Sequence, residues 1–409
     1  MNGYIDDNKP LKLNIGFIGL GKRGRDLLKL LADMPDVSIT ALSDLYEDRL
    51  QEVFQLLSEK GSPAPFCYKD YRDVIGHGEV QAIIIASSWT SHSEIAMAAM
   101  KAGKPVASEV GGAASLEECW QLVRTYEATG TPCMMLENCC YGREEMALLN
   151  MVRQGMFGEL IHCQGAYGHD LREEVAKGVE NRHYRVHNYL HRNGDVYPTH
   201  GLGPAAKLLG INRGNRFTKL SSMATKSRGI RQWARKNMGD DHPVAQTDMA
   251  LGDIVTTMIQ CANGESILLT HDTSLPRPYS RGGRVQGTRG IWMEDGAVIH
   301  IEDRSPAHEW EKFETYIQEF EHPVWADYLK DGVRGGHGGM DYLCLRAFIE
   351  SVRLNTEMPI DIYDMAAWMA VTALSEQSIE LGGSAVAFPD FTNGRWIHRP
   401  AANKTAYAL

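Results

Sequence analysis

Three glycines, Gly19, Gly21 and Gly24, directly follow a short apolar run, and the carboxylate Asp44 comes twenty residues after the last of them. This spacing suits a turn that holds a pyrophosphate, because glycine permits the tight turn, close backbone approach and helix packing, and the next helix offers free N–H groups. Asp44 is placed to accept both hydroxyls of an adenosine ribose, and its charge disfavours a 2′-phosphate. The pattern predicts an NAD site. The alternatives are an ordinary strand–helix turn at the glycines and a helix cap at Asp44.

The elements around this turn alternate in type from Leu11 to Leu136. Short β-branched runs are separated by stretches with apolar residues at every third or fourth position, which is helical spacing. Strands separated by helices of this length favour a parallel, doubly wound sheet. The predicted strands are Leu13–Ile18, Val37–Leu42, Ala82–Ala86, Pro105–Val106 and Cys133–Leu136, and the predicted helices are Arg23–Ala32, Asp48–Glu59, Ser91–Ala102 and Leu116–Thr129.

The pattern changes beyond residue 140, where strands follow one another with short turns, so a mostly antiparallel second sheet is expected. The chain is predicted to divide into a nucleotide-binding domain, residues 1–140, and an α/β domain for substrate binding and oligomerisation, residues 141–409, whose last helices pack back on the first domain. The polar segments His169–Arg192 and Met223–Gln246 are expected to be functional loops. The strands are Leu160–Ala166, Asp253–Gln260, Ser266–His271, Arg284–Gly287, Gly290–Met293 and Ala297–Ile301, and the helices are Tyr141–Arg153, Asp341–Leu354 and Asp364–Leu381.

Composition narrows the class of protein. The 409 residues carry 42 basic and 52 acidic side chains, a formal net charge of −10, which argues against binding to nucleic acid or to an anionic membrane. The polar start of the chain and the absence of a long apolar run predict no signal peptide, no membrane span and a cytoplasmic location. Eight cysteines without a C-x-x-C pair predict free, buried thiols and no zinc site.

Longer motifs extend over most of the chain, and together with the glycine turn they resemble one family. They are Trp89–His92, Glu109-Val110, Asn138, Gly165–Tyr167, Tyr184-Arg185, Arg192–Pro204 and Thr270–Arg281. The chain resembles the glucose-fructose oxidoreductase/inositol dehydrogenase superfamily and, more narrowly, glycoside hydrolase family 109, the NAD-dependent α-N-acetylgalactosaminidase group. The resemblance implies an N-terminal Rossmann dinucleotide-binding domain, a C-terminal α/β domain with an open, mostly antiparallel sheet, and tightly held NAD that is not consumed.

The resemblance also implies roles for individual positions. Two departures stand out: sugar dehydrogenases of the superfamily usually have Glu-Lys-Pro where this chain has Glu109-Val110-Gly111, and they place an aspartate where it has Val196. The missing lysine favours the hydrolase, although Gly111-Gly112 departs from both groups. The implied cofactor contacts are Gly19, Gly21, Lys22, Arg23, Gly24, Asp44, Trp89, Thr90, Ser91, His92, Glu109, Val110, Asn138, Tyr197 and His200, and the implied substrate contacts are Tyr167, Arg185, Tyr197, Pro198, Thr199, His200 and Tyr279.

The implied reaction is redox-neutral. NAD takes a hydride from C3 of the sugar, the acidified C2 proton is removed, the leaving group departs from C1, water adds, and the hydride returns. His200 is the candidate base for the 3-hydroxyl, because an imidazole titrates near neutrality. Tyr197 and Tyr167 are the candidates for the C2 proton and for leaving-group assistance, in either order. Arg185 would hold sugar hydroxyls or an acetamido carbonyl, and Tyr279 would lie over the sugar.

Structural alternatives exist for each candidate. His200 would be a core histidine, Tyr167 and Tyr279 sheet aromatics, Arg185 a solvated loop residue, and Trp89 to His92 the start of a helix with Ser91 as its cap. The spacing of His183, His187 and His191 resembles a metal site on a helix, but no metal is predicted, because the family needs none and Asn188–Asn193 disfavours helix.

At the level of the whole protein, a sugar or cyclitol dehydrogenase and a non-catalytic sugar sensor are the competing functions. The exact glycoside, its anomer and its aglycone stay open. The open face of the second sheet predicts a homodimer or homotetramer.

Overall fold

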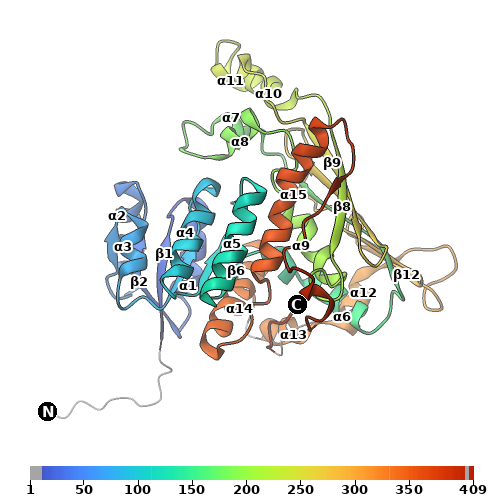
Figure 1. Ribbon diagram of the computed structural model, residues 1–409, viewed down its shortest axis with the longest axis horizontal. Helices are drawn as coiled ribbons and strands as arrows, with labels where there is room; N and C mark the ends of the chain where they lie inside the picture. Colours follow the sequence, from blue (N-terminus) through green and yellow to red (C-terminus); the bar gives the residue numbers. More distant parts are fainter. Residues whose placement is uncertain (1–11, 112, 331, 401–404) are drawn as a thin grey trace.

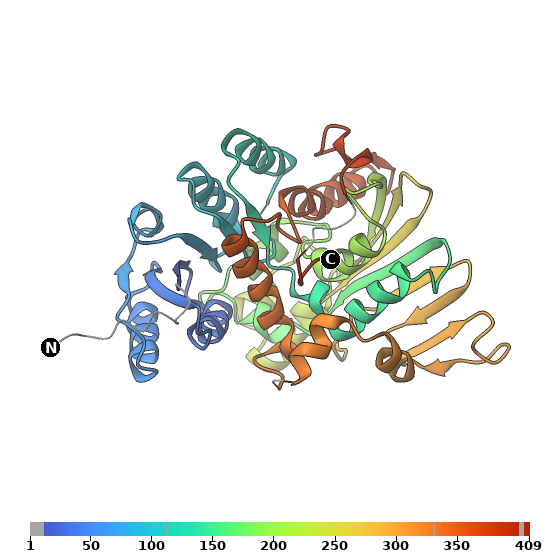
Figure 2. The same cartoon turned by 90° about the horizontal axis from the view of Figure 1, so that it is seen from below.

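The computed structural model describes residues 12–111, 113–330, 332–400 and 405–409. These residues form a six-stranded sheet and a nine-stranded sheet. The two sheets lie side by side, with α14 (Met340–Leu354) and α15 (Ile362–Glu380) between them (Figures 1 and 2). Helix α15 contacts both α5 (Leu116–Thr129), a helix that covers the first sheet, and β8 (Phe217–Ala224), a strand of the second sheet.

The first sheet is parallel and doubly wound, as predicted, with the strand order β3-β2-β1-β4-β5-β6. Its central strands are buried on both faces because helices cover each side, so the run Ala82–Ile85 is wholly apolar. The strands are β1 Leu13–Ile18, β2 Val37–Ser43, β3 Phe66–Tyr68, β4 Ala82–Ile85, β5 Val106–Ser108 and β6 Cys133–Met135, and the helices are α1 Lys22–Ala32, α2 Glu47–Glu59, α3 Tyr71–Gly76, α4 Trp89–Lys101 and α5 Leu116–Thr129.

Strand β3 and helix α3 were absent from the sequence prediction. The strand has three residues, of which Phe66 and Cys67 are exposed, so it shows no buried period. It forms because Ala41 to Ser43 of β2 offer an unpaired edge. Tertiary pairing, and not local propensity, therefore creates this edge strand.

The second sheet has the order β14-β13-β12-β11-β7-β10-β9-β8-β15. Only β7 and β10 run parallel, so the predicted mostly antiparallel sheet is confirmed. The strands are β7 Leu160–Gly168, β8 Phe217–Ala224, β9 Ile254–Cys261, β10 Ser266–Asp272, β11 Arg284–Gly287, β12 Gly290–Met293, β13 Val298–Ile301, β14 Glu311–Lys312 and β15 Val386–Ala387.

Helix α9 (Thr199–Leu208) lies directly against β7 because two glycines meet. A Cβ atom on Gly165 would stand 2.3 Å from the carbonyl oxygen of Gly201, and one on Gly201 would stand 2.5 Å from the Ala166 nitrogen. No larger side chain fits at either position. The contact brings the first turn of α9, with His200, next to Tyr167 on β7.

The predicted loops His169–Arg192 and Met223–Gln246 are in part helical, which corrects the prediction. They contain α7 (Arg172–Ala176), α8 (Arg185–His191), α10 (Gly229–Met238) and α11 (Pro243–Gln246), and β8, which was not predicted, ends at Ala224. Helix α10 buries Ile230 and Ala234, which are four residues apart. Polar residues lie between these two, so the helical period of α10 was not recognised in the sequence. The remaining helices are α6 Arg143–Arg153, α12 Phe313–Phe320 and α13 Pro323–Lys330, and the short 3₁₀ turns are Asn138–Tyr141, His337–Gly339 and Arg395–Ile397.

The thiols are all free and all buried except that of Cys67, which is exposed, so the expectation of buried thiols is wrong at that position. In the part of the chain that the structure describes, no helix has the length and apolar character needed to cross a membrane.

Candidate active site

The glycine turn after β1 has the geometry of a phosphate cradle. Gly19 adopts φ +95°, and a Cβ atom there would stand 2.4 Å from the nitrogen of Ser87. A Cβ atom on Gly24 would stand 2.0 Å from the Gly19 oxygen. Helix α1 begins at Lys22 with no side-chain cap and no acidic residue in its first turn. Its first N–H groups are therefore available to an anion, which fits the diphosphate of NAD.

Asp44 ends up buried beyond the carboxyl end of β2, next to the glycine turn. One carboxylate oxygen accepts from the Leu20 amide at 2.7 Å and the other from the Tyr46 amide at 2.9 Å. Arg49 lies 3.7 Å from the same carboxylate. Asp44 is thus fixed beside the glycine turn, where a ribose acceptor is expected.

Three predicted cofactor residues, Arg23, Glu109 and Asn138, form one network with Asp341, a residue that the sequence did not suggest. The Arg23 guanidinium pairs with Glu109 at 2.8 Å and with Asp341 of α14 at 2.7 Å. The Asn138 amide donates to Asp341 at 2.7 Å. Burial opposes ionisation of the Asp341 carboxyl, but the hydrogen bonds and charges of His337 and Arg23 outweigh it and hold the pKa of Asp341 far below its usual range. The network ties α1, β5 and the turn after β6 to α14.

The stretch Trp89–His92 begins helix α4, as its structural alternative proposed, but Ser91 is not the cap. The Ser91 hydroxyl donates to the Ser88 carbonyl at 2.9 Å. His92 is buried, with its ring nitrogens 3.0 Å from the Ser87 oxygen and 3.4 Å from the Gly111 oxygen. Burial lowers the pKa of His92, so the ring is neutral and links the turns after β4 and β5. Thr90, exposed, lies beside it in the first turn.

Gly111, whose presence the sequence left unexplained, makes room for Trp89. It adopts φ +80°, and a Cβ atom there would stand 2.7 Å from the indole nitrogen of Trp89. Proline cannot adopt this φ, so the proline of the Glu-Lys-Pro pattern would not fit here. Gly112 lies outside the described residues. The Trp89 ring packs in turn on Tyr184 and Tyr197, with centroid distances of 4.9 Å and 5.4 Å.

The three predicted catalytic residues come together. Ring centroids are 4.4 Å apart between Tyr167 and Tyr197, 4.8 Å between Tyr197 and His200, and 5.4 Å between Tyr167 and His200. The Tyr197 hydroxyl is 3.4 Å from His200 Nε2. Pro198 is the N-cap of α9, and Thr199, the first residue of the helix, is buried.

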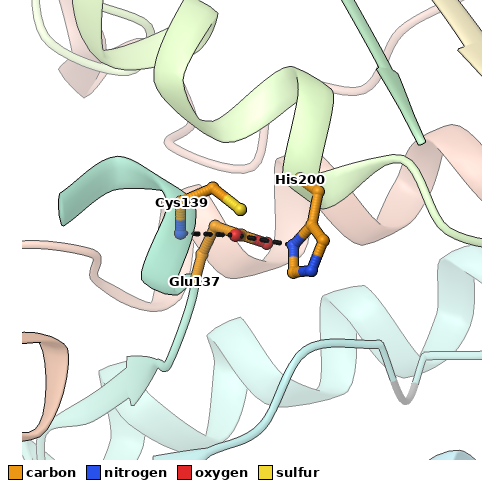
Figure 3. Close-up of side chains that lie close together, drawn as sticks. All are labelled: Glu137, Cys139 and His200. Atoms are coloured by element: carbon orange, nitrogen blue, oxygen red, sulfur yellow. Dashed lines mark hydrogen bonds and ion pairs between the residues drawn. The ribbon is translucent and has the colours of Figure 1, made fainter. Parts of the chain in front are cut away.

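Glu137, which the sequence analysis missed, completes this cluster (Figure 3). Its Oε1 atom accepts from His200 Nδ1 at 2.8 Å and from the Cys139 amide at 3.1 Å. The side chain is completely buried, and Oε2 has no hydrogen-bond partner among the described residues. The only available signal was its position next to Asn138, directly beyond the carboxyl end of β6.

The electrostatics of the pair correct one expectation. Burial alone would lower the pKa of His200, but Cys139 and Glu137 outweigh it, and the pKa is raised well above its ordinary value. Burial opposes ionisation of Glu137 too, yet the charge and hydrogen bond of His200 lower its pKa. The two groups form an imidazolium–carboxylate pair. The charge of Glu137 therefore favours the protonated form of His200.

Arg185 is the first residue of α8 and is buried, not solvated. Its guanidinium carbon lies 5.1 Å from the ring centroid of Trp89 and 5.4 Å from that of Tyr197. Its Nε atom is 2.9 Å from Glu174, and Nη1 has no hydrogen-bond partner among the described residues. A buried, unpartnered donor beside Tyr197 is suited to bind an oxygen of a ligand.

Tyr279 is half exposed. Its ring is edge-on to His169, with centroids 5.2 Å apart, and His169 Nδ1 is 3.3 Å from the Tyr167 hydroxyl. His169, another residue that sequence reasoning missed, thus connects Tyr279 to the cluster around His200.

The histidine spacing considered as a metal pattern does not form one face. His187 and His191 are on α8 with centroids 4.5 Å apart, but His183 precedes the helix and stacks on Tyr184. Within the described ranges, the grouping of three metal-ligand side chains is instead Glu137, Cys139 and His200, whose ligand atoms lie within 4.8 Å of one another.

Comparison with protein families gives two matches. Residues 13–137 match the model "Oxidoreductase family, NAD-binding Rossmann fold", and residues 141–398 match "Glycosyl hydrolase 109, C-terminal domain". A glycosyl hydrolase family 109 protein of Stenotrophomonas maltophilia is 45% identical over 95% of this chain and 91% of its own. An alpha-N-acetylgalactosaminidase of Tannerella forsythia is 43% identical over 95% of this chain and 88% of its own.

Solved structures share the fold at low sequence identity. A levoglucosan dehydrogenase in complex with NADH and levoglucosan has a TM-score of 0.72 and 17% identity, covering 92% of this chain and 100% of that chain. An inositol dehydrogenase homolog from Azotobacter vinelandii with NAD⁺ has a TM-score of 0.69 and 18% identity, covering 93% and 98%. These likenesses concern the fold alone.

Proposed function

The chain belongs to glycosyl hydrolase family 109 and has an NAD-binding Rossmann domain, and from this premise we propose that it is a glycosidase whose NAD is regenerated in every turnover. α-N-Acetylgalactosaminides or closely related glycosides are the proposed substrates, in line with the name of the Tannerella forsythia relative. The observation that carries the proposal is the pairing of Glu137 with His200 beside Tyr197 and Tyr167.

The cofactor, when bound, supplies reversible oxidation of a sugar carbon. The glycine turn and the free start of α1 would hold its diphosphate, and Asp44 would hold the adenosine ribose and exclude a 2′-phosphate. Val110, which is buried, replaces the lysine typical of sugar dehydrogenases and has no proton to give or take. Proton transfer therefore falls to the cluster around His200.

His200 is the proposed base for a sugar hydroxyl. Its Nδ1 atom is held by Glu137, so only Nε2 faces the rest of the cluster. It acts as a base only in the form that carries no proton on Nε2. Glu137 then stabilises the imidazolium that forms as the proton arrives.

The two tyrosines divide the remaining proton transfers. Burial raises the pKa of Tyr197 well above its ordinary value, and Tyr167 and Glu137 raise it further. Tyr197 therefore keeps its proton at neutral pH and acts as the donor to the departing oxygen. Tyr167, which contacts Tyr197 ring to ring, would take the C2 proton as its phenolate and become the neutral phenol, and the unpartnered Arg185 Nη1 would bind a sugar oxygen.

A nitrophenyl α-N-acetylgalactosaminide in deuterated water tests this proposal. The enzyme should release nitrophenol without a steady rise in nicotinamide absorbance, and deuterium should appear at C2 of the product. His200→Ala should abolish both signals while leaving NAD bound. Cleavage without deuterium at C2 would contradict the proposed route.

A sugar or cyclitol dehydrogenase is the second candidate, favoured by the dehydrogenase fold that surrounds the site. It predicts steady NADH formation in proportion to the substrate consumed. A sensor without turnover would instead bind glycoside equally well after replacement of His200 or Tyr197.

We also propose a homodimer or homotetramer formed through the outer face of the second sheet. Met223 on β8 and Met258 on β9 are exposed there, 69% and 45%, respectively. Light scattering of the wild type and of Met258→Lys would test it. The cytoplasmic location stays a prediction.

A further inference from the structure

The segment 177–184, between α7 and α8, contacts the nucleotide-binding part of the chain at two places. The Arg182 guanidinium makes two hydrogen bonds to Asp48 in the first turn of α2, at 3.2 Å and 2.7 Å, and lies 4.3 Å from the ring centroid of Tyr46. Tyr184 packs on Trp89 in the first turn of α4. Figure 1 shows α7 and α8 above the upper ends of the helices of the first sheet.

The strand order reveals what lies between these two places. Tyr46 and Asp48 follow β2, Trp89 follows β4, and β1 lies between β2 and β4 in the sheet. The turn that leaves β1 is the glycine turn, Gly19–Gly24. A segment that contacts elements following both β2 and β4 must pass over that turn. This is the edge of the sheet at which a dinucleotide binds.

The segment has a defined conformation of its own. Arg182 adopts φ +54°, a left-handed conformation that is unusual for a residue with a side chain. The amide of His183 donates to the Gly178 carbonyl at 2.7 Å and closes the turn. Arg49 lies 4.7 Å from the centroid of the Tyr46 ring, so two arginines contact that ring beside Asp44.

We propose that residues 177–184 are a strap that retains NAD, and that Arg182 fastens it on the adenosine side. The side chains of Arg182 and Asp48 are 42% and 63% exposed, so their ion pair is weak enough to open when the cofactor enters. Closed, the strap blocks the way out across the glycine turn. The inference depends on NAD binding and not on the glycosidase reaction, because retention is measured without substrate.

The test compares Arg182→Ala with a matched control, Arg304→Ala. Arg304 also makes two hydrogen bonds to a carboxylate, Glu319, is 38% exposed, and lies over the ring of Tyr316. The release of NAD from purified holoenzyme is followed by an excess of an NAD-consuming enzyme. Arg182→Ala and Asp48→Asn should each release NAD about two- to tenfold faster than wild type, and Arg304→Ala at the wild-type rate.

The double variant shows whether the two residues act together. If the pair fastens the strap, Arg182→Ala with Asp48→Asn releases NAD no faster than the faster single variant, since the second change removes nothing more. The proposal would be overturned if the fold-increases in release rate of the two single variants multiplied in the double variant. It would also be overturned if Arg182→Ala released NAD as slowly as Arg304→Ala. The thermal unfolding midpoints of Arg182→Ala, Asp48→Asn and the double variant are compared with that of Arg304→Ala. Equal midpoints show that the faster release of NAD does not come from loss of the fold.

Discussion

Glu137 and His200, 63 residues apart in the chain, form a buried hydrogen-bonded ion pair with 2.8 Å between Oε1 and Nδ1. The pair fixes which nitrogen of the imidazole is free, because Nδ1 is occupied. The charge of the Glu137 carboxylate also helps to raise the pKa of His200, together with Cys139. The pH dependence of the reaction should therefore depend on Glu137.

Glu137→Gln is expected to move the rising, acid-side limb of the pH profile of kcat/KM to lower pH. The amide keeps an acceptor near Nδ1 but removes the negative charge that raises the pKa of His200. The base form then exists at lower pH, and the acid-side limb should move with it. The profile is measured with a nitrophenyl glycoside between pH 4 and pH 9.

Glu321→Gln is the control for this variant, because Glu321 is paired with Arg143 away from the cluster. Glu321→Gln should leave the acid-side limb of the kcat/KM profile at the wild-type pH. If the acid-side limb of Glu137→Gln stayed at the wild-type pH, a group other than the Glu137–His200 pair would control that side of the profile.

Tyr197→Phe should slow the cleavage of glycosides with poor leaving groups far more than of those with good ones. The ring contacts remain, but the proton for the departing oxygen is lost. Nitrophenolate leaves without such help, whereas an alkoxide does not, so the loss for a methyl glycoside should exceed that for a nitrophenyl glycoside by about 10²-fold. If the cleavage rates of the methyl and nitrophenyl glycosides fell by the same factor, Tyr197 would not be the acid that protonates the leaving group.

The sequence predicted the parallel first sheet, apart from β3, and the glycine turn that follows β1, because these depend on local period and on motifs. The motifs also marked Tyr167, Tyr197 and His200, which lie close together in the structure, and their roles stay predictions. Sequence reasoning missed Glu137 and Asp341, whose roles arise from partners at sequence distances of 63 and 318 residues. No local pattern marks such a carboxylate. Gly111 was noticed but unexplained, since its reason is the indole of Trp89, which packs against it only in the folded chain.

Gly111→Ala is expected to lower both the stability and the activity of the enzyme. The new Cβ atom would meet the Trp89 indole, and φ +80° is strained for alanine. Gly103→Ala is the matched control, because Gly103 has φ +71° but nothing within 4 Å of the added atom. Urea unfolding should show a loss of about 1 kcal/mol for Gly103→Ala and a larger loss for Gly111→Ala.

The activity of the two glycine variants separates strain from packing. Displacement of Trp89 would disturb Arg185 and Tyr197, so Gly111→Ala should raise KM for the glycoside, while Gly103→Ala should not. An unchanged KM in Gly111→Ala would mean that the position of the Trp89 ring does not matter for substrate binding.

Asp195→Asn should stabilise the protein at pH 8 and have little effect at pH 4. Asp195 is buried, and within the described part of the chain its carboxylate accepts only from the Tyr197 amide, at 3.2 Å. Burial raises its pKa to about 7, partly offset by that hydrogen bond. An unfolded aspartate has a pKa of about 3.9. Between these values the unfolded chain has released its proton and the native protein has not, so stability falls as the pH rises through this window.

Asparagine keeps the acceptor for the Tyr197 amide and has no proton to lose, so it avoids this cost. The full difference of about three pKa units corresponds to about 4 kcal/mol, which is an upper limit for the gain at pH 8. Urea unfolding at both pH values measures it, with the exposed Asp240→Asn as the control. A gain of equal size at pH 4 and pH 8 would mean that titration of Asp195 does not produce the effect.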